Sequence, residues 1–335
     1  MTIKDLSART GYSVGTISRV LNNQPNVSDK AREVILQAAN ECSFQLNTNA
    51  KQLKQQHSTS ILVVVKGISN ELFARLVEAI QSRSAQLGHP LIVDYIDEND
   101  NEVRRAVQLC LEKKPIGVLF LGGNRENFLA DFGKITVPSV LVTNDAAGLP
   151  FPNLSSVSSD NALAARMAID HLVSLGHRKI AVIGGQREVS DTTHLRYQGC
   201  LEAFSQHGIV FDEALDYEEA RFSYSDGYRA ARQLLQRDRG FTALFAMSDV
   251  MAIGAIRALE DAGKRVPEDV SVIGLDGLDI GKYTIPRLAT ICQAVDALAE
   301  TSLKLLCSCF DSKTEPRYEI VPVYPEWMES AGRIE

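Results

Sequence analysis

The sequence lacks the features that mark membrane proteins and secreted proteins. None of its 335 residues lies in an uninterrupted apolar run of 18 or more, which is the length that a membrane-spanning helix needs. The opening, MTIKDLSART, has no basic segment followed by an apolar one, so it does not resemble a signal peptide. We therefore expect no membrane partner, and we expect the protein to be cytoplasmic.

Cysteine pairs and catalytic motifs are also missing. The six cysteines are scattered, and the two closest, Cys307 and Cys309, form a C-x-C whose helical setting points the thiols apart. We expect reduced thiols rather than disulfides or a metal site. The sequence has no G-x-x-x-x-G-K-[ST], G-x-S-x-G, H-E-x-x-H or paired C-x-x-C, and its six histidines are isolated. We therefore predict no enzymatic activity, no cofactor and no metal.

Charge is distributed unevenly along the chain, whose net charge is −7. Residues 1–60 contain seven Lys or Arg and four Asp or Glu, so this segment carries +3 and the remainder carries −10. A small basic segment joined to an acidic body favours an N-terminal part that binds a polyanion and a body with another task.

Three short helices are predicted near the N-terminus, over residues 3–10, 13–21 and 28–42. Gly11 separates the first two, and Ser13 and Ser28 stand where helix N-caps are expected. In the stretch SVGTISRVLN, Ile17, Val20 and Leu21 recur at i, i+3 and i+4, so one side of this helix is committed to a small core. The opposite side carries small and hydroxyl-bearing residues and one arginine.

A helix–turn–helix places its second helix in the major groove of DNA, with the first residues of that helix at the base edges. Val14 can contact a thymine methyl group, Arg19 can bind the O6 and N7 of a guanine, and the hydroxyl groups suit phosphate oxygens. The residues predicted to contact DNA are Ser13, Val14, Gly15, Thr16, Ser18, Arg19 and Asn22. A three-helix module that binds protein is the alternative.

The N-terminal segment TIKDLSARTGYSVGTISRVLNNQPNVSDKAREVILQAANECSFQLNTNAKQL resembles the DNA-binding domain of the LacI/GalR family of transcriptional regulators. It follows the family pattern T-x-x-D-[VL]-A-x-x-[AT]-G-V-S-x-x-T-[VI]-S-R-V-[LI]-N almost throughout, with Ser7 in place of Ala and Tyr12 in place of Val. Val14 and Gly15 occupy the two positions that vary with operator sequence. The resemblance implies a sequence-specific regulator, most simply a repressor.

The segment NTNAKQLKQQHSTS, residues 47–60, is polar and contains neither Gly nor Pro. A helix from Asn47 to about Gln55 would be too short to be stable alone in water. The resemblance implies that this segment is a hinge helix that enters the minor groove beside its twin from a second copy. Ala50 and Lys51 match the flanking groove contacts, and Leu53 matches a leucine that wedges into the central base step. A solvated linker is the alternative.

From residue 61, short apolar runs such as ILVVV, GVLFLG, KIAVIGG and VSVIGLDG alternate with amphipathic helical stretches. Such strands predict parallel sheets covered by helices on both faces. The fold class we predict is an N-terminal all-α helix–turn–helix head plus an α/β core of two doubly wound parallel-sheet subdomains, like a periplasmic binding protein.

Ligands of such sheets bind at the carboxyl ends of the strands. Ser248 and Asp249 follow one predicted strand, Asp276 ends another, Asp160 precedes a helix, and Arg196 follows a Gly-Gly turn. An arginine flanked by carboxylates can hold several hydroxyl groups, which is the chemistry of polyol recognition. Taken singly, each residue could instead be a helix cap or a solvated loop charge.

The resemblance extends over the core through DHLVSLGHRKIAVIGG, RYQGCLEAF, SDVMAIGAIRALEDAGKRVPEDVSVIGLDG and IPRLATI. These segments look like the family's effector-binding core, which is similar to periplasmic sugar-binding proteins. By matching position, the resemblance implies effector contacts for Arg196, Asp249 and Asp276, and less securely for Asp160, Thr192 and Ser248. Phe222 and Phe73 are candidate aromatic contacts, with core packing as the alternative.

The resemblance implies a DNA-binding domain of residues 1–46, a hinge and linker of 47–60, and an effector-binding and dimerisation core of 61–335. The chain is expected to cross three times between subdomain 1, about 61–158 and 290–320, and subdomain 2, about 159–289 and 321–335.

The partners that the resemblance implies are double-stranded DNA with a palindromic operator, a small effector such as a sugar, and a second copy of the chain. A homodimer is the minimum for a palindrome. No leucine heptad follows Val323, so we favour a dimer over a tetramer. The alternatives are a solute-binding protein, which would not carry the basic head, and a nucleobase-sensing regulator of the corepressor type.

Overall fold

The structure is a computed structural model that describes residues 3–21, 25, 27–42, 59–68, 70–187, 190–237, 239–310 and 315–334. The chain divides into two compact units, Met1–Ser58 and Thr59–Glu335. Four residues predicted to contact DNA lie outside the described residues, and their roles stay predictions: Asn22, Ala50, Lys51 and Leu53.

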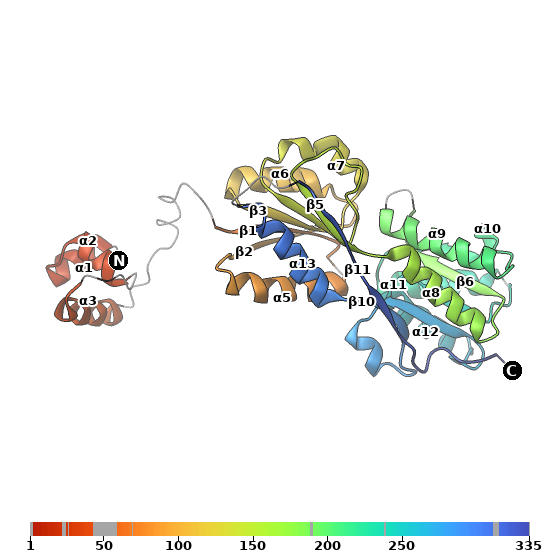
Figure 1. The fold of residues 1–335 in the computed structure, drawn as a ribbon. Coiled ribbons are helices and arrows are strands. Elements are labelled where there is room, and N and C mark those ends of the chain that lie inside the picture. Colours follow the sequence, from red (N-terminus) through yellow and green to blue (C-terminus); the bar gives the residue numbers. More distant parts are fainter. Residues whose placement is uncertain are drawn as a thin grey trace. The chain divides into compact units, whose positions relative to one another are not determined.

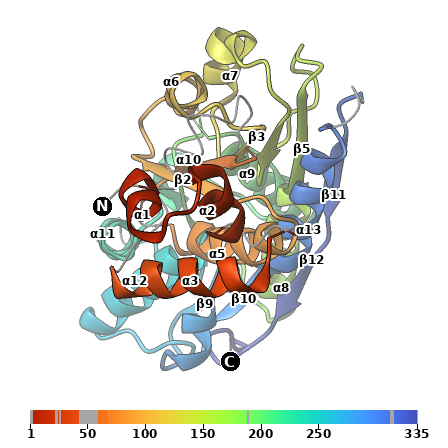
Figure 2. The ribbon, with the colours of Figure 1, turned by 90° about the vertical axis from the view of Figure 1, so that its left-hand side faces the viewer.

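The first unit contains three helices, shown in Figures 1 and 2: α1 Ile3–Thr10, α2 Val14–Leu21 and α3 Asp29–Glu41. Each helix contributes to one small core whose centre is formed by the fully buried side chains of Leu6, Ile17 and Ile35. The two predicted N-caps are confirmed, because Ser13 Oγ accepts a hydrogen bond from the Thr16 amide at 3.2 Å and Ser28 Oγ accepts one from the Ala31 amide at 3.4 Å. The head therefore has the predicted helix–turn–helix arrangement.

The first sheet of the core has the strand order β11-β5-β4-β3-β1-β2, and its pairings are parallel. Its strands are β1 Ile61–Lys66, β2 Leu91–Ile96, β3 Gly117–Leu121, β4 Ser139–Val142, β5 Leu154–Ser159 and β11 Tyr318–Val321. The central strands are apolar and buried along almost their whole length, as parallel strands between two helical layers must be.

Helices cover both faces of this first sheet (Figure 1). One face packs against α5 Glu71–Gln86 and α13 Val295–Cys307. The other face packs against α6 Glu102–Lys113, α7 Arg125–Asp131 and the short 3-10 helix η1 Phe132–Lys134. The predicted three-layer arrangement is confirmed for this subdomain.

The second sheet has the order β12-β10-β9-β8-β6-β7. Its strands are β6 Ile180–Gly184, β7 Tyr217–Glu219, β8 Ala243–Ala246, β9 Ser271–Asp276, β10 Ala289–Gln293 and β12 Val323–Glu326. The last strand, β12, runs antiparallel to β10, so this sheet is mixed rather than wholly parallel as predicted. Only Pro322 separates β12 from β11 of the other sheet, so the chain enters the second sheet at the carboxyl ends of its parallel strands, where Val323 pairs with Gln293.

The helices of the second subdomain also form two layers. One face of the sheet packs against α8 Asn161–Ser174 and α9 Asp191–Gln206, and the other packs against α11 Tyr224–Gln236 and α12 Asp249–Asp261. The short α10 Glu213–Asp216 precedes β7, and the 3-10 helix η2 Asp279–Tyr283 follows β9.

The chain passes between the two sheets after β5, after β10 and after β11. Strand β10 pairs with β9 and β12 of the second sheet. The return to the first subdomain therefore begins after Gln293, three residues beyond the boundary of about 290 in the prediction. The strands that lead into these passages, β5, β10 and β11, lie at or next to one edge of their sheet.

Helices α11 and α12 cross at two glycines that let their backbones touch. A Cβ added at Gly254 would lie 2.1 Å from the carbonyl oxygen of Tyr224, and one added at Gly227 would lie 2.3 Å from that of Met251. These distances are far below van der Waals contact, and the obstructing atoms are backbone atoms. Glycine is therefore needed at this crossing.

We expect Gly254→Ala to lower the free energy of unfolding of the core by about 2 kcal/mol, because overpacking of the crossing outweighs the gain in helix propensity. Urea unfolding followed by circular dichroism measures the change. Gly15→Ala in α2 is the control, since the nearest atom to its added Cβ is Ser13 Oγ at 3.7 Å. A Gly254→Ala protein as stable as the parent would contradict the close crossing.

Candidate functional site

The outer face of α2 carries the residues predicted to contact base edges. Val14 is 41% exposed, Gly15 and Arg19 are exposed, and Arg19 forms no ion pair within the part of the head that the structure describes. Among the described residues of the head, the only atom within 4 Å of a Cβ added at Gly15 is Ser13 Oγ at 3.7 Å, so none of them requires a glycine there. A glycine that costs about 1 kcal/mol of helix propensity without an internal reason indicates close approach by something outside the head.

The hydroxyl groups predicted to contact DNA lie beside this face. Ser13 Oγ and Thr16 Oγ1 are 2.9 Å apart at the first turn of α2, and Ser18 is half-buried. The hydroxyl proton that is not used between Ser13 and Thr16 can be donated to a phosphate oxygen. The structure therefore brings Ser13, Val14, Gly15, Thr16 and Arg19 together at the start and outer side of one helix.

Arg196 is the centre of the site in the core. It lies on α9 and is 3% exposed. Its Nε donates to Asn161 Oδ1 at 2.9 Å, its Nη1 donates to the Met247 carbonyl at 2.5 Å, and its Nη2 lies 3.9 Å from Asp276 Oδ1. Burial lowers the pKa of Arg196, while the nearby carboxylates oppose the change. A guanidinium stays charged in such a setting, so it must be compensated by oxygen atoms.

Asp276 closes the site at the end of β9. Its backbone has φ +133°, a left-handed conformation that favours glycine and costs a non-glycine residue about 1–3 kcal/mol. Its Oδ1 accepts a hydrogen bond from Gln293 Nε2 at 2.8 Å, and Gln293 Oε1 in turn accepts one from Ser159 Oγ at 2.9 Å. The strained residue is thus held beside Arg196 by a chain of contacts that links β9, β10 and β5.

Gln293 and Asn161 were missed in the sequence, although both lie at the site. Gln293 is the last residue of β10, and Asn161 is the first residue of α8. Both side chains are buried. A lone amide at the carboxyl end of an apolar strand was the available signal for Gln293, since ligands of these sheets bind at that end.

The structure corrects the interpretation of Asp249 as an effector contact. Its side chain is fully buried, and its two oxygens accept hydrogen bonds from the Leu278 amide at 2.7 Å and from Thr290 Oγ1 at 2.6 Å. Burial, with the neighbouring charge of Asp276, raises the pKa of Asp249. The carboxylate therefore fixes the loop after β9 from inside the protein, and it is not presented to a ligand.

Ser248 is likewise fully buried, and its Oγ accepts a hydrogen bond from the Met251 amide at 3.4 Å as the N-cap of α12. The helix-cap alternative therefore describes its role. Asp160 also caps a helix, since its Oδ1 accepts from the Leu163 amide at 2.9 Å at the start of α8. In contrast to Ser248, Asp160 is half-buried and lies directly before Asn161. Of these two predicted contacts, only Asp160 keeps an accessible side chain near Arg196.

The remaining predicted contacts differ in their surroundings. Thr192 is half-buried in the first turn of α9, one turn before Arg196. Phe222 is half-buried and packs against the cluster under α11 and α12. Phe73 is 7% exposed within the core under α5, so the core-packing alternative describes it. Thr192 and Phe222 therefore keep surface that a ligand could touch.

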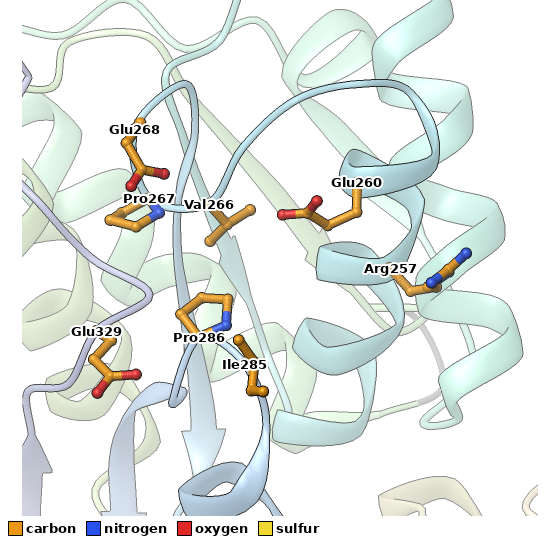
Figure 3. Close-up of a pocket in the computed structure, with 8 residues that line it drawn as sticks. All are labelled: Arg257, Glu260, Val266, Pro267, Glu268, Ile285, Pro286 and Glu329. Atoms are coloured by element: carbon orange, nitrogen blue, oxygen red, sulfur yellow. The ribbon is translucent and has the colours of Figure 1, made fainter.

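A second hollow lies at the opposite end of the same sheet (Figure 3). It is formed where the segments before β9 and β10 meet the end of α12, and it is lined by Arg257, Glu260, Val266, Pro267, Glu268, Ile285, Pro286 and Glu329. These segments enter the amino ends of the strands, whereas Arg196 and Asp276 lie at the carboxyl ends. This hollow is therefore separate from the Arg196 site.

Among the residues that the structure describes, no helix is both long enough and apolar enough to cross a membrane. The same residues contain no group of three or more His, Cys, Asp or Glu side chains arranged to hold a metal ion.

Comparison with known proteins identifies both units. Residues 2–47 match the model of bacterial regulatory proteins of the lacI family, and residues 169–329 match that of the periplasmic binding protein-like domain. The HTH-type transcriptional regulator MalR of Clostridium butyricum is 34% identical over 326 residues, which cover 96% of each chain.

Solved structures extend the likeness over nearly the whole chain. The Lac repressor dimer bound to operator and the anti-inducer ONPF has a TM-score of 0.83 and 26% identity and covers 99% of both chains. A LacI family transcriptional regulator from Enterococcus faecium with bound ribose has a TM-score of 0.72 and 27% identity, and it covers 82% of this chain and all of that one. The relatives are transcriptional regulators rather than enzymes. The chain thus belongs to the LacI family of bacterial transcriptional regulators, with a helix–turn–helix head that binds DNA and a core that binds an effector.

Proposed function

We propose that this regulator is a repressor whose affinity for a palindromic operator changes when a small sugar-like effector binds beside Arg196. The observation that carries this proposal is the buried Arg196 guanidinium, which lies 3.9 Å from the strained carboxylate of Asp276 at the carboxyl ends of the strands. A fixed donor and a fixed acceptor at this distance can each bind a hydroxyl group of the same ligand. Asp160, Thr192 and Phe222 are the further contacts that we propose.

The effector that fits this site best is uncharged. Lys66 of the facing subdomain pairs with Glu102 at 2.5 Å, and Arg196 is accompanied by Asp276 at 3.9 Å. The site therefore presents a cation and a carboxylate side by side. A phosphate group would be repelled by the Asp276 carboxylate, whereas a neutral polyol can bind both charged groups. Ribose, which is bound in the similar Enterococcus faecium regulator, belongs to this class.

We propose the same division of labour that the family relationship suggests: a DNA-reading head of residues 1–46, a hinge of 47–60 with Ala50, Lys51 and Leu53 in the minor groove, and a core of 61–335. Asn22 joins the contacts of α2. Because the target is DNA, we place the protein in the cytoplasm, and we assign it no catalytic activity, cofactor or metal.

We also propose that the protein acts as a homodimer, because a palindrome presents two half-sites related by a twofold axis. Tyr283 and Ile285 are 80% and 93% exposed and stand two positions apart in the chain, and Ile285 lines the hollow of Figure 3. Large apolar side chains that are so exposed and so close together favour a protein interface. The occupant that we propose is the same surface of a second copy, as closed twofold symmetry requires.

Arg19→Ala should weaken operator binding by about 1–3 kcal/mol, because a bidentate contact to guanine is lost. Electrophoretic mobility shifts with the promoter region of the regulator's own gene and with random duplex DNA measure the effect. We expect the loss on the operator only, with effector binding unchanged. Equal losses on both DNAs would show that Arg19 contacts the backbone instead of a base.

Arg196→Ala, and the charge-conserving Arg196→Lys, should leave operator binding in place and abolish the response to effector. Removal of hydrogen bonds to a charged group costs about 1.5–3 kcal/mol each, so effector affinity should fall at least tenfold. A thermal-shift screen with neutral sugars and sugar phosphates, followed by mobility shifts with each ligand that binds, checks the result. A normal response in Arg196→Lys would place the effector elsewhere.

Tyr283→Glu combined with Ile285→Glu should shift the protein from dimer to monomer in sedimentation velocity at micromolar concentration, since two charges would be buried at the proposed interface. Operator affinity should fall as the dimer is lost. Val210→Glu is the matched control, because Val210 is 88% exposed elsewhere in the core. A double variant that stays dimeric would exclude this surface.

A further inference from the structure

The two subdomains are joined by the chain at one edge only. Strand β11 lies at one edge of the first sheet with β5 next to it, and β2 lies at the other edge. Strand β12 lies at one edge of the second sheet with β10 next to it, and β7 lies at the other edge. Neighbouring strands are about 4.8 Å apart, so β2 and β7 are about 20 Å from the passages between sheets. A contact between the β2 edge and the β7 edge therefore acts on subdomain rotation with a long lever arm.

Arg221 makes such a contact. It follows β7, whereas Asp97 and Glu98 follow β2 of the other subdomain. Arg221 Nη2 lies 3.2 Å from Asp97 Oδ1 and 3.1 Å from Asp97 Oδ2, and Arg221 Nε donates to Glu98 Oε1. One planar guanidinium of subdomain 2 thus binds two carboxylates of subdomain 1. The Asn99 amide and the Arg221 guanidinium hold the pKa of Asp97 below its ordinary value, so the carboxylate is charged at neutral pH.

Two more contacts join the subdomains on the same side. The Tyr224 hydroxyl at the start of α11 donates to Glu71 Oε1 at 2.5 Å, and Arg75 Nη1 on α5 donates to the Gly277 carbonyl at 2.7 Å. Gly277 directly follows Asp276 of the effector site. Both of these contacts start from α5 of subdomain 1, so the two subdomains are linked there as well as at Arg221.

We propose that Arg221, with Asp97 and Glu98, forms a salt-sensitive clasp that holds the effector cleft closed and thereby sets effector affinity. Arg221 acts as a positioning residue, because its contacts are Asp97 and Glu98 of the other subdomain and not the effector. The statement that the clasp sets effector affinity rests on the proposed function. The statement that it holds the two subdomains together does not, since it concerns the protein without ligand.

Because the side chains of the clasp are exposed to solvent, its ion pairs are weak and their strength depends on the salt concentration. The Arg221, Asp97 and Glu98 side chains are 51%, 47% and 29% exposed. Exposed ion pairs shift an equilibrium by up to about fivefold each and are screened by salt. A contribution of this size cannot lock the cleft, but it changes the fraction of closed molecules, and a ligand that binds the closed form changes its apparent affinity by the same factor.

The test compares five full-length proteins by small-angle X-ray scattering without ligand, at 50 and 500 mM NaCl: wild type, Arg221→Ala, Asp97→Ala/Glu98→Ala, the triple variant, and Arg265→Ala. Arg265 is the matched control, because its exposed ion pair with Asp269, at 3.0 Å, lies within one subdomain. We expect Arg221→Ala to have the larger radius of gyration at low salt, and we expect wild type to approach that value at high salt.

The triple variant should coincide with Arg221→Ala, because groups that act through one contact are not additive. Arg265→Ala should follow wild type at both salt concentrations. The proposal is overturned if Arg221→Ala and Arg265→Ala scatter alike, or if the effects of Arg221→Ala and Asp97→Ala/Glu98→Ala simply add.

A ribose titration followed by thermal shift tests the link to affinity. Wild type should bind ribose more weakly at 500 mM than at 50 mM NaCl, and Arg221→Ala should bind about threefold to tenfold more weakly at low salt and lose the salt dependence. Equal binding by wild type and Arg221→Ala overturns the link. If wild type binds no ribose, ribose is excluded as the effector, and the scattering comparison still decides whether the clasp exists.

Discussion

The structure of the core depends on one buried cation. Removing a guanidinium from water is costly unless several oxygen atoms surround it, and the partners of Arg196 come from three separate places: Asn161 at the start of α8, the Met247 carbonyl after β8, and Asp276 at the end of β9. These elements can satisfy Arg196 only in one mutual arrangement. The long 3.9 Å separation from Asp276 leaves both charges able to gain from a ligand with hydroxyl groups.

This site lies next to the passages that join the subdomains, which explains how a small ligand could act on the whole core. Gln293 binds Asp276 through one end of its amide and Ser159 through the other, and the chain leaves its sheet directly after both Gln293 and Ser159. A ligand that binds Asp276 thus acts beside the passages between the subdomains. The ion pairs of Arg221 lie at the opposite edges of the two sheets, beside β2 and β7. In our proposal the passages define the axis of rotation between the subdomains, and the clasp shifts the equilibrium between the open and closed forms.

Much of the fold could be predicted because hydrophobic periodicity and capping residues are local signals; Ser13 and Ser28 cap helices where expected. The site was harder, because Asp249 and Asp276 look alike in sequence, each following an apolar strand. Only the folded backbone separates them: Asp249 begins α12 and is bound from inside by Leu278 and Thr290, whereas Asp276 takes φ +133° beside Arg196. The direction of a side chain at a strand end is a tertiary property that no spacing encodes.

The helical glycines of this chain differ in whether the fold itself requires them. The glycines at the α11–α12 crossing are explained within the protein, since Cβ atoms at Gly227 and Gly254 would strike backbone atoms at 2.3 and 2.1 Å. Gly15 has no such neighbour among the described residues, yet it occupies a helix, where alanine would be more stable by about 1 kcal/mol. A helical glycine without an internal cause favours an external one, and on α2, beside the exposed side chains of Val14 and Arg19, the external surface that we propose is the major groove of DNA.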